Sequence, residues 1–157
     1  LLKDNNEIIF LIVGDGSEKE DILKYKLHNK IKNLVLVDPI PKKNVIPLLK
    51  EYSDVCFIGL MSQPLFRFGV SPNKMFDYLY SAKPIIQSID SANDIVKEAK
   101  AGISVKPENP KEIADAILKL YKMPKSKRNE LGQNGKVYVE KHHSYKQLAK
   151  QYEYLFN

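Results

Sequence analysis

Hydrophobic and polar positions along the chain follow two alternating periods. Short apolar runs, several of them rich in β-branched residues, predict buried strands at residues 8–13, 34–37, 54–59, 84–88 and 102–105. Apolar residues three or four positions apart predict helices at residues 17–27, 44–52, 72–82, 93–100, 110–122, 125–142 and 145–156. This alternation favours an α/β fold: a Rossmann-like, doubly wound parallel sheet in three α/β/α layers, with a helical carboxyl-terminal end. We expect all the strands to join one sheet.

Length and charge narrow the classes of protein. The 157 residues suffice for one domain with a core, and 25 Lys and Arg against 19 Asp and Glu give a net charge of +6. This charge fits either a lysine-rich surface or an anionic partner, such as a nucleotide diphosphate, a lipid phosphate or a membrane surface. The basic residues form no block, which argues against a nucleic-acid partner. The apolar run at residues 8–13 is too short to span a bilayer.

The single cysteine and the histidines suggest neither a disulfide nor a metal site. Cys56 lies in an apolar run, has no partner within the chain, and fits a small buried side chain in a reducing cytoplasm. We therefore expect a cytoplasmic protein. The histidines lack the spacing of metal ligands on one helical face, and we interpret them as surface residues: His28, His142 and His143.

Two glycines follow the first predicted strand. Gly14 and Gly16 begin a pattern similar to a dinucleotide fingerprint, but Lys19 stands where that pattern requires its third glycine. The segment therefore predicts a tight turn from strand to helix, with Ser17 capping the helix.

The segment at residues 66–79 carries the clearest chemistry. Pro72 marks the start of a helix, so the N–H groups of Ser71, Asn73 and Lys74 should be free to bind an anion. Lys74 adds a positive charge, and Gly69 lets the backbone approach a ligand closely. The sequence therefore predicts a phosphate site here.

Asp77 lies four residues after Asn73, so both share one face of this helix. A carboxylate one turn from a phosphate site can accept hydrogen bonds from ribose hydroxyls, as a bound nucleotide diphosphate would require. The alternative is that Ser71 caps the helix and Asp77 pairs with Lys74 on a solvated surface.

Several segments together carry a family resemblance. They are Gly14-Asp15-Gly16, Asp54-Val55, and residues 71–78, 83–86 and 101–107, with Gly132, Gly135 and Tyr145 in the predicted closing helices. In order and spacing they resemble the carboxyl-terminal, donor-binding domain of group 1 glycosyltransferases, which is half of a GT-B fold. The Ser-Pro-Asn-Lys run resembles a subgroup associated with bacterial surface polysaccharide synthesis.

The resemblance implies roles for individual residues. Of the two glutamates that bind the donor in this family, the ribose-binding one corresponds to Asp77, and the sugar-binding one corresponds to Gly69. The diphosphate would lie against Ser71, Pro72, Asn73 and Lys74. The remaining donor-binding residues it implies are Gly14, Gly16 and, beside the nucleobase, Ile40. It implies a retaining, metal-independent transfer of a hexosyl-type group from a UDP-linked donor, with no cofactor, and leaves the catalytic residues unknown.

The resemblance also implies an organisation. Residues 1–157 would form one nucleotide-sugar-binding domain that lacks the family's leading strand, helix and basic pair, as well as the amino-terminal acceptor domain. We expect this chain alone to be inactive and to bind nucleotide weakly, at about 1 mM. Expected partners are a nucleotide diphosphate sugar and the acceptor domain, with a membrane surface or lipid-linked acceptor at the inner face of the plasma membrane. The alternatives are a non-catalytic nucleotide-binding or regulatory module, and a sugar-nucleotide epimerase fragment.

Overall fold

The computed structural model describes residues 1–155, without the side chains of Tyr145, Gln151, Tyr154 and Leu155. It separates into two compact units, Leu1–Val45 and Ile46–Asn157. The predicted single domain over residues 1–157 stays a prediction, and each unit is described by itself below.

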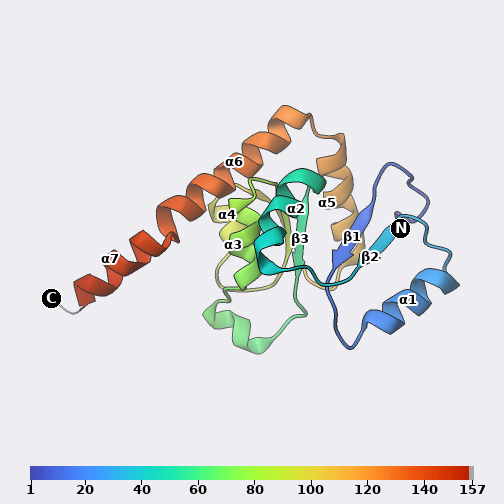
Figure 1. Ribbon diagram of the computed structural model, residues 1–157, viewed down its shortest axis with the longest axis horizontal. Coiled ribbons are helices and arrows are strands. Elements are labelled where there is room, and N and C mark those ends of the chain that lie inside the picture. The colour runs from blue at the N-terminus through green and yellow to red at the C-terminus, as the bar shows by residue number, and fades with distance from the viewer. Residues whose placement is uncertain (156–157) are drawn as a thin grey trace. The chain divides into compact units, whose positions relative to one another are not determined.

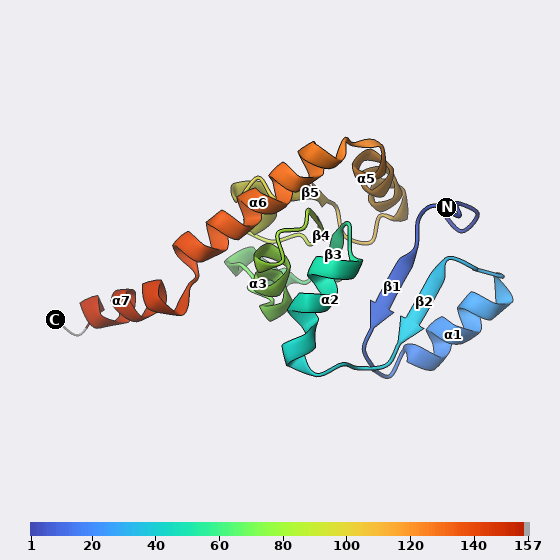
Figure 2. The same cartoon turned by 45° about the horizontal axis from the view of Figure 1, so that its top comes forward.

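The first unit is a β–α–β arrangement (Figure 2). It contains β1 (Phe10–Val13), α1 (Lys19–His28), β2 (Leu34–Val37) and the 3₁₀ helix η1 (Lys42–Asn44). The two strands are parallel, and both end in valine, Val13 opposite Val37.

One buried side chain ties the amino-terminal segment to this unit. Asn33 is 7% exposed, and its Nδ2 donates hydrogen bonds to the carbonyl oxygens of Leu2, Asn5 and Ile8. The predicted helix cap is wrong, because Glu18 rather than Ser17 occupies the N-cap of α1 and no side chain within the part of the chain that the structure describes caps this helix.

The second unit carries a parallel sheet with the strand order β3-β4-β5, whose strands are labelled in Figure 2. Its elements are α2 (Val45–Tyr52), β3 (Cys56–Gly59), the 3₁₀ helix η2 (Pro64–Phe68), α3 (Asn73–Tyr80), β4 (Ile85–Ser88), α4 (Ile95–Glu98), β5 (Gly102–Val105), α5 (Pro110–Lys122), α6 (Lys125–His142) and α7 (Tyr145–Leu155). Its last two helices, α6 and α7, are drawn in orange and red in Figure 1. Every predicted strand and helix is present, and Phe156, the last residue of the final predicted helix, lies outside the described residues.

Side chains from both faces of this sheet are buried. Successive residues of β4 point to opposite faces, so Ile85 packs with Met75 and Leu79 of α3, whereas Ile86 packs with Leu120 of α5. Helices therefore cover both faces, which confirms the α/β layers that the apolar runs predict.

The structure differs from the expected single sheet in one respect. The strands fall into a two-stranded sheet, β1-β2, and a three-stranded sheet, β3-β4-β5. A run of apolar residues indicates that a segment is an extended, buried strand. It does not indicate which strand lies beside it, because parallel neighbours are joined by crossovers of about a dozen residues or more and need not be consecutive in the chain.

Candidate functional site

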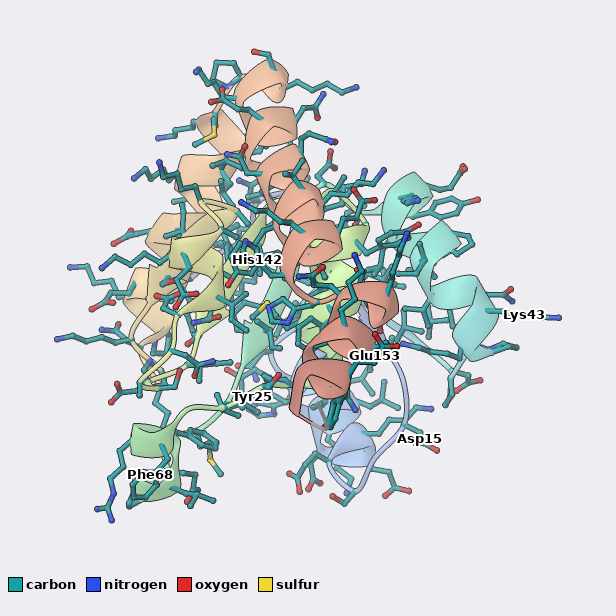
Figure 3. The ribbon with its side chains drawn as sticks, turned by 90° about the vertical axis from the view of Figure 1, so that its left-hand side faces the viewer. Asp15, Tyr25, Lys43, Phe68, His142 and Glu153 are labelled. Carbon is teal, nitrogen blue, oxygen red and sulfur yellow. The ribbon has the colours of Figure 1, made fainter. Side chains whose placement is uncertain are left out.

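The connection from β3 to α3 contains the residues of the predicted phosphate site. It runs through η2 and ends in a turn at Gly69, whose φ of 97° and ψ of 161° lie in a region that side chains rarely adopt. The Gly69 N–H donates to the carbonyl oxygen of Phe66 at 2.9 Å. Phe68, just before the turn, is 74% exposed and lies at the far end of this loop in Figure 3. Glycine is therefore required here by the backbone.

A side chain from the β4–α4 connection holds the residue after this turn. The N–H of Val70 donates to Asn93 Oδ1 at 2.8 Å, and Asn93 Nδ2 donates to the carbonyl oxygen of Val70 at 2.9 Å. A third hydrogen bond, from the Ala92 N–H to the Phe66 carbonyl oxygen, is 3.0 Å long. The side-chain amide thus pairs with Val70 as a neighbouring strand would.

A shallow pocket of about 420 Å³ lies beside this pairing. The residues that line it are Phe68, Gly69, Val70, Ser71, Ala92 and Asn93. The structure therefore brings two of the predicted donor-binding residues, Gly69 and Ser71, to the same pocket.

Helix α3 begins directly after the pocket. Pro72 occupies its N-cap with an extended ψ of 128°, and no side chain of the described residues caps the helix. The predicted Ser71 cap is therefore wrong, whereas the pairing of Asp77 with Lys74 stays a prediction. Asn73 and Lys74 are exposed, and none of the hydrogen bonds described for residues 1–155 uses either backbone N–H. These free N–H groups, the helix dipole and the Lys74 ammonium together favour an anion.

Asp77 lies one turn further along the same helix. It is half-buried, and its backbone carbonyl accepts a hydrogen bond from the Ser81 N–H at 2.9 Å. Asp77 therefore lies on the same helix as the predicted phosphate site, on the face of α3 that it shares with Asn73.

The other predicted donor-binding residues lie in the first unit. Gly14 and Gly16 flank Asp15 after β1, and Ile40 is half-buried after β2. Whether these residues meet those of α3 in one site stays a prediction.

An ion pair joins the ends of β1 and β2 in this unit. Lys19 Nζ lies 2.7 Å from Asp38 Oδ1 and 3.7 Å from Asp15 Oδ1. The hydrogen bond between Lys19 and Asp38 raises the pKa of Lys19 and lowers the pKa of Asp38. The lysine that replaces the third glycine of the dinucleotide pattern thus ties together the loops after the two strands.

A second pocket, of about 950 Å³, lies among α4, β5 and α5. Asp94 lines it, but its Oδ1 already accepts hydrogen bonds from Gln87 Nε2, the Lys97 N–H and Ser104 Oγ at 3.1, 2.9 and 2.8 Å. These bonds cap α4 and fix it to the sheet, so the Asp94 carboxylate has a structural role.

Sequence reasoning missed Asn93. A single asparagine after a strand is typical of many loops. Its contact with Val70, 23 positions earlier in the chain, appears only in the structure.

The described residues 1–155 contain no cluster of three His, Cys, Asp or Glu side chains placed to hold a metal ion. Within the same residues, no helix is both long and apolar enough to cross a bilayer.

Comparison with known proteins decides the family. The model for "Glycosyl transferases group 1" matches residues 1–138. The chain belongs to this family. A curated relative, an uncharacterized glycosyltransferase of Methanocaldococcus jannaschii, is 24% identical over 99% of the chain, which spans 38% of that relative's length. This chain therefore spans well under half of the length of that curated relative.

Solved structures share the fold. Sucrose-phosphate synthase of Thermosynechococcus elongatus gives a TM-score of 0.72 at 20% identity, over 93% of this chain and 38% of that one. The C-terminal domain of a group 1 glycosyltransferase from Francisella tularensis gives a TM-score of 0.69 at 19% identity, over 92% of this chain and 74% of that one. Anabaena HepE, solved in complex with UDP-glucose, gives a TM-score of 0.68 at 15% identity, over 86% of this chain and 37% of that one. These likenesses confirm the carboxyl-terminal GT-B fold that the resemblance implied.

Proposed function

We propose that this chain binds the nucleotide-sugar donor of a retaining, metal-independent glycosyltransferase, with the diphosphate at the amino end of α3. The observation that carries the proposal is the exposed start of α3, where the N–H groups of Asn73 and Lys74 have no acceptor among residues 1–155, beside the pocket at Gly69 and Ser71. Family membership supports a sugar-nucleotide as the anion.

In this proposal, Lys74, the first N–H groups of α3 and Asp77 have different roles. As the glycosidic bond to the donor breaks, negative charge builds on the departing diphosphate. The Lys74 ammonium and the first N–H groups of α3 stabilise that charge, because they are oriented before the reaction begins. Asp77 accepts hydrogen bonds from the ribose hydroxyls.

The likeness to Anabaena HepE, which was solved with UDP-glucose, supports uridine as the base. We place the reaction in bacterial surface polysaccharide synthesis, with a separate acceptor-binding domain. A net charge of +6 also fits peripheral attachment to an anionic membrane that carries a lipid-linked acceptor.

The test is calorimetric titration of the chain with UDP and GDP, together with the variant Lys74→Ala. Loss of one charge-assisted hydrogen bond should weaken UDP binding about tenfold. Lys111→Ala is a matched control, because Lys111 is an exposed lysine in the first turn of α5. If the wild type and Lys74→Ala bind UDP with equal affinity, the diphosphate does not bind at the start of α3.

One observation favours a second candidate, a non-catalytic nucleotide-binding module. Gly69 occupies the position of the sugar-binding glutamate, and its backbone conformation suits glycine alone. A module of this kind would bind UDP and the UDP-sugar equally well, whereas the donor site should favour the sugar-nucleotide.

A further inference from the structure

The turn before α3 and the β4–α4 connection are joined by hydrogen bonds that the proposed function has not used. We infer that Asn93 is a positioning residue, whose side chain sets the path of the chain at Gly69 and Val70 so that the N–H groups at the start of α3 face a diphosphate. This inference rests on the proposed function of the same site.

The Asn93 amide fixes the peptide group of Val70. It bonds to both the N–H and the carbonyl of Val70, at 2.8 and 2.9 Å, so it fixes the direction of that peptide as well as its position. Val70 also packs against the apolar core, where Met75 of α3 lies. The amide thus holds the chain three residues before α3 begins.

The backbone around Asn93 is itself held by hydrogen bonds. Ser91 Oγ donates to the Asn93 carbonyl oxygen at 2.6 Å, and the Ala92 N–H donates to the Phe66 carbonyl oxygen at 3.0 Å. Asp94, the next residue, caps α4. Bonds on both sides of Asn93 therefore fix its backbone, so its side chain can direct the more exposed loop.

The Asn93 side chain also lies close to Gly69. A Cβ placed on Gly69 would lie 3.1 Å from Asn93 Oδ1 and 3.5 Å from Asn93 Cγ. The Asn93 amide therefore lies in the space beside the position that carries a glutamate in the family. Gly69 and Asn93 act as one unit: the glycine provides the turn, and the asparagine holds it.

The test compares binding of UDP with binding of uridine, by NMR titration of the whole chain. Asn93→Ala should weaken UDP binding about tenfold, because the N–H groups of α3 are no longer oriented, and should leave uridine binding unchanged. Asn134→Ala is the control: Asn134 Nδ2 also donates to a distant backbone carbonyl, that of Lys100, at 3.2 Å. It should leave the affinity for both ligands unchanged.

Two results would overturn the role of Asn93. One is wild-type affinity for UDP in folded Asn93→Ala, and the other is an equal loss of UDP and uridine binding. If Asn93→Ala does not fold, Asn93→Ser, whose shorter side chain lacks the amide that pairs with Val70, is measured in the same way and judged by the same results. If the wild type binds neither UDP nor GDP, the proposed function fails, and the role of Asn93 fails with it.

Discussion

The packing of α6 makes a quantitative prediction for Gly132→Ala. Gly132 is buried where α6 crosses the turn between α3 and β4, and a Cβ there would lie 2.0 Å from the Ala82 carbonyl oxygen and 2.5 Å from its carbonyl carbon. Both atoms belong to the backbone, so no side-chain rotation relieves the contact. The helix or the turn must shift by about 1.4 Å, because an ordinary contact begins at 3.4 Å and this one is 2.0 Å.

The expected loss of stability follows from two opposing terms. Alanine in place of glycine stabilises a helix by about 1 kcal/mol, whereas overpacking of a rigid site costs about 3 kcal/mol. The net loss in the free energy of unfolding is therefore about 2 kcal/mol. Urea unfolding followed by circular dichroism measures it as a lower midpoint with an unchanged slope.

A control in the same helix separates packing from helix propensity. Asn129 is exposed in α6, so Asn129→Ala should leave the stability unchanged or raise it by a few tenths of a kcal/mol. If Gly132→Ala proves as stable as the wild type, the close approach of α6 to Ala82 is refuted.

Three further predictions concern the site and the end of α6. Asp77→Asn should weaken binding of UDP more than that of 2′-deoxy-UDP, and equal weakening in a titration would give Asp77 a structural role only. Residues 1–157 alone should show no glycosyl transfer in a donor-turnover assay, because proximity of a bound acceptor supplies much of such a rate; turnover would contradict the need for a second domain. Burial, together with the charge of His142, lowers the pKa of His143 below its ordinary 6.5, and Glu98 opposes this shift. The imidazole of His143 therefore binds a proton more readily in the unfolded chain, so the free energy of unfolding should fall as the pH drops below 6.5. In urea unfolding measured at several pH values, His143→Gln should lose less of this free energy than the wild type does.

The fold is mostly predictable from the sequence because its signals are local. The bounds of β2, β5, α5 and α6 coincide with the predicted ones, since a Pro, Asn or Gly residue lies at or beside one end of each segment. The division into two sheets is not predictable in this way, because strand pairing depends on distant partners.

Part of the site is also predictable, because the start of α3 has a local sequence signal. The start of α3 is visible in the sequence as Pro72 followed by Asn73 and Lys74, although Pro72 proves to be the cap rather than part of the first turn. Asn93 is not visible, because its role arises from a contact with Val70 across 23 positions. The need for glycine at position 69 likewise depends on a backbone φ of 97°.

The most direct test of the central claim is to map UDP onto the chain by backbone amide NMR. We predict that the largest shifts on adding UDP occur at Ser71, Asn73 and Lys74, and that Lys74→Ala reduces them. Shifts confined to the larger pocket at Lys97 and Lys106, or no shift at the start of α3 under saturating UDP, would contradict the claim that α3 holds the diphosphate.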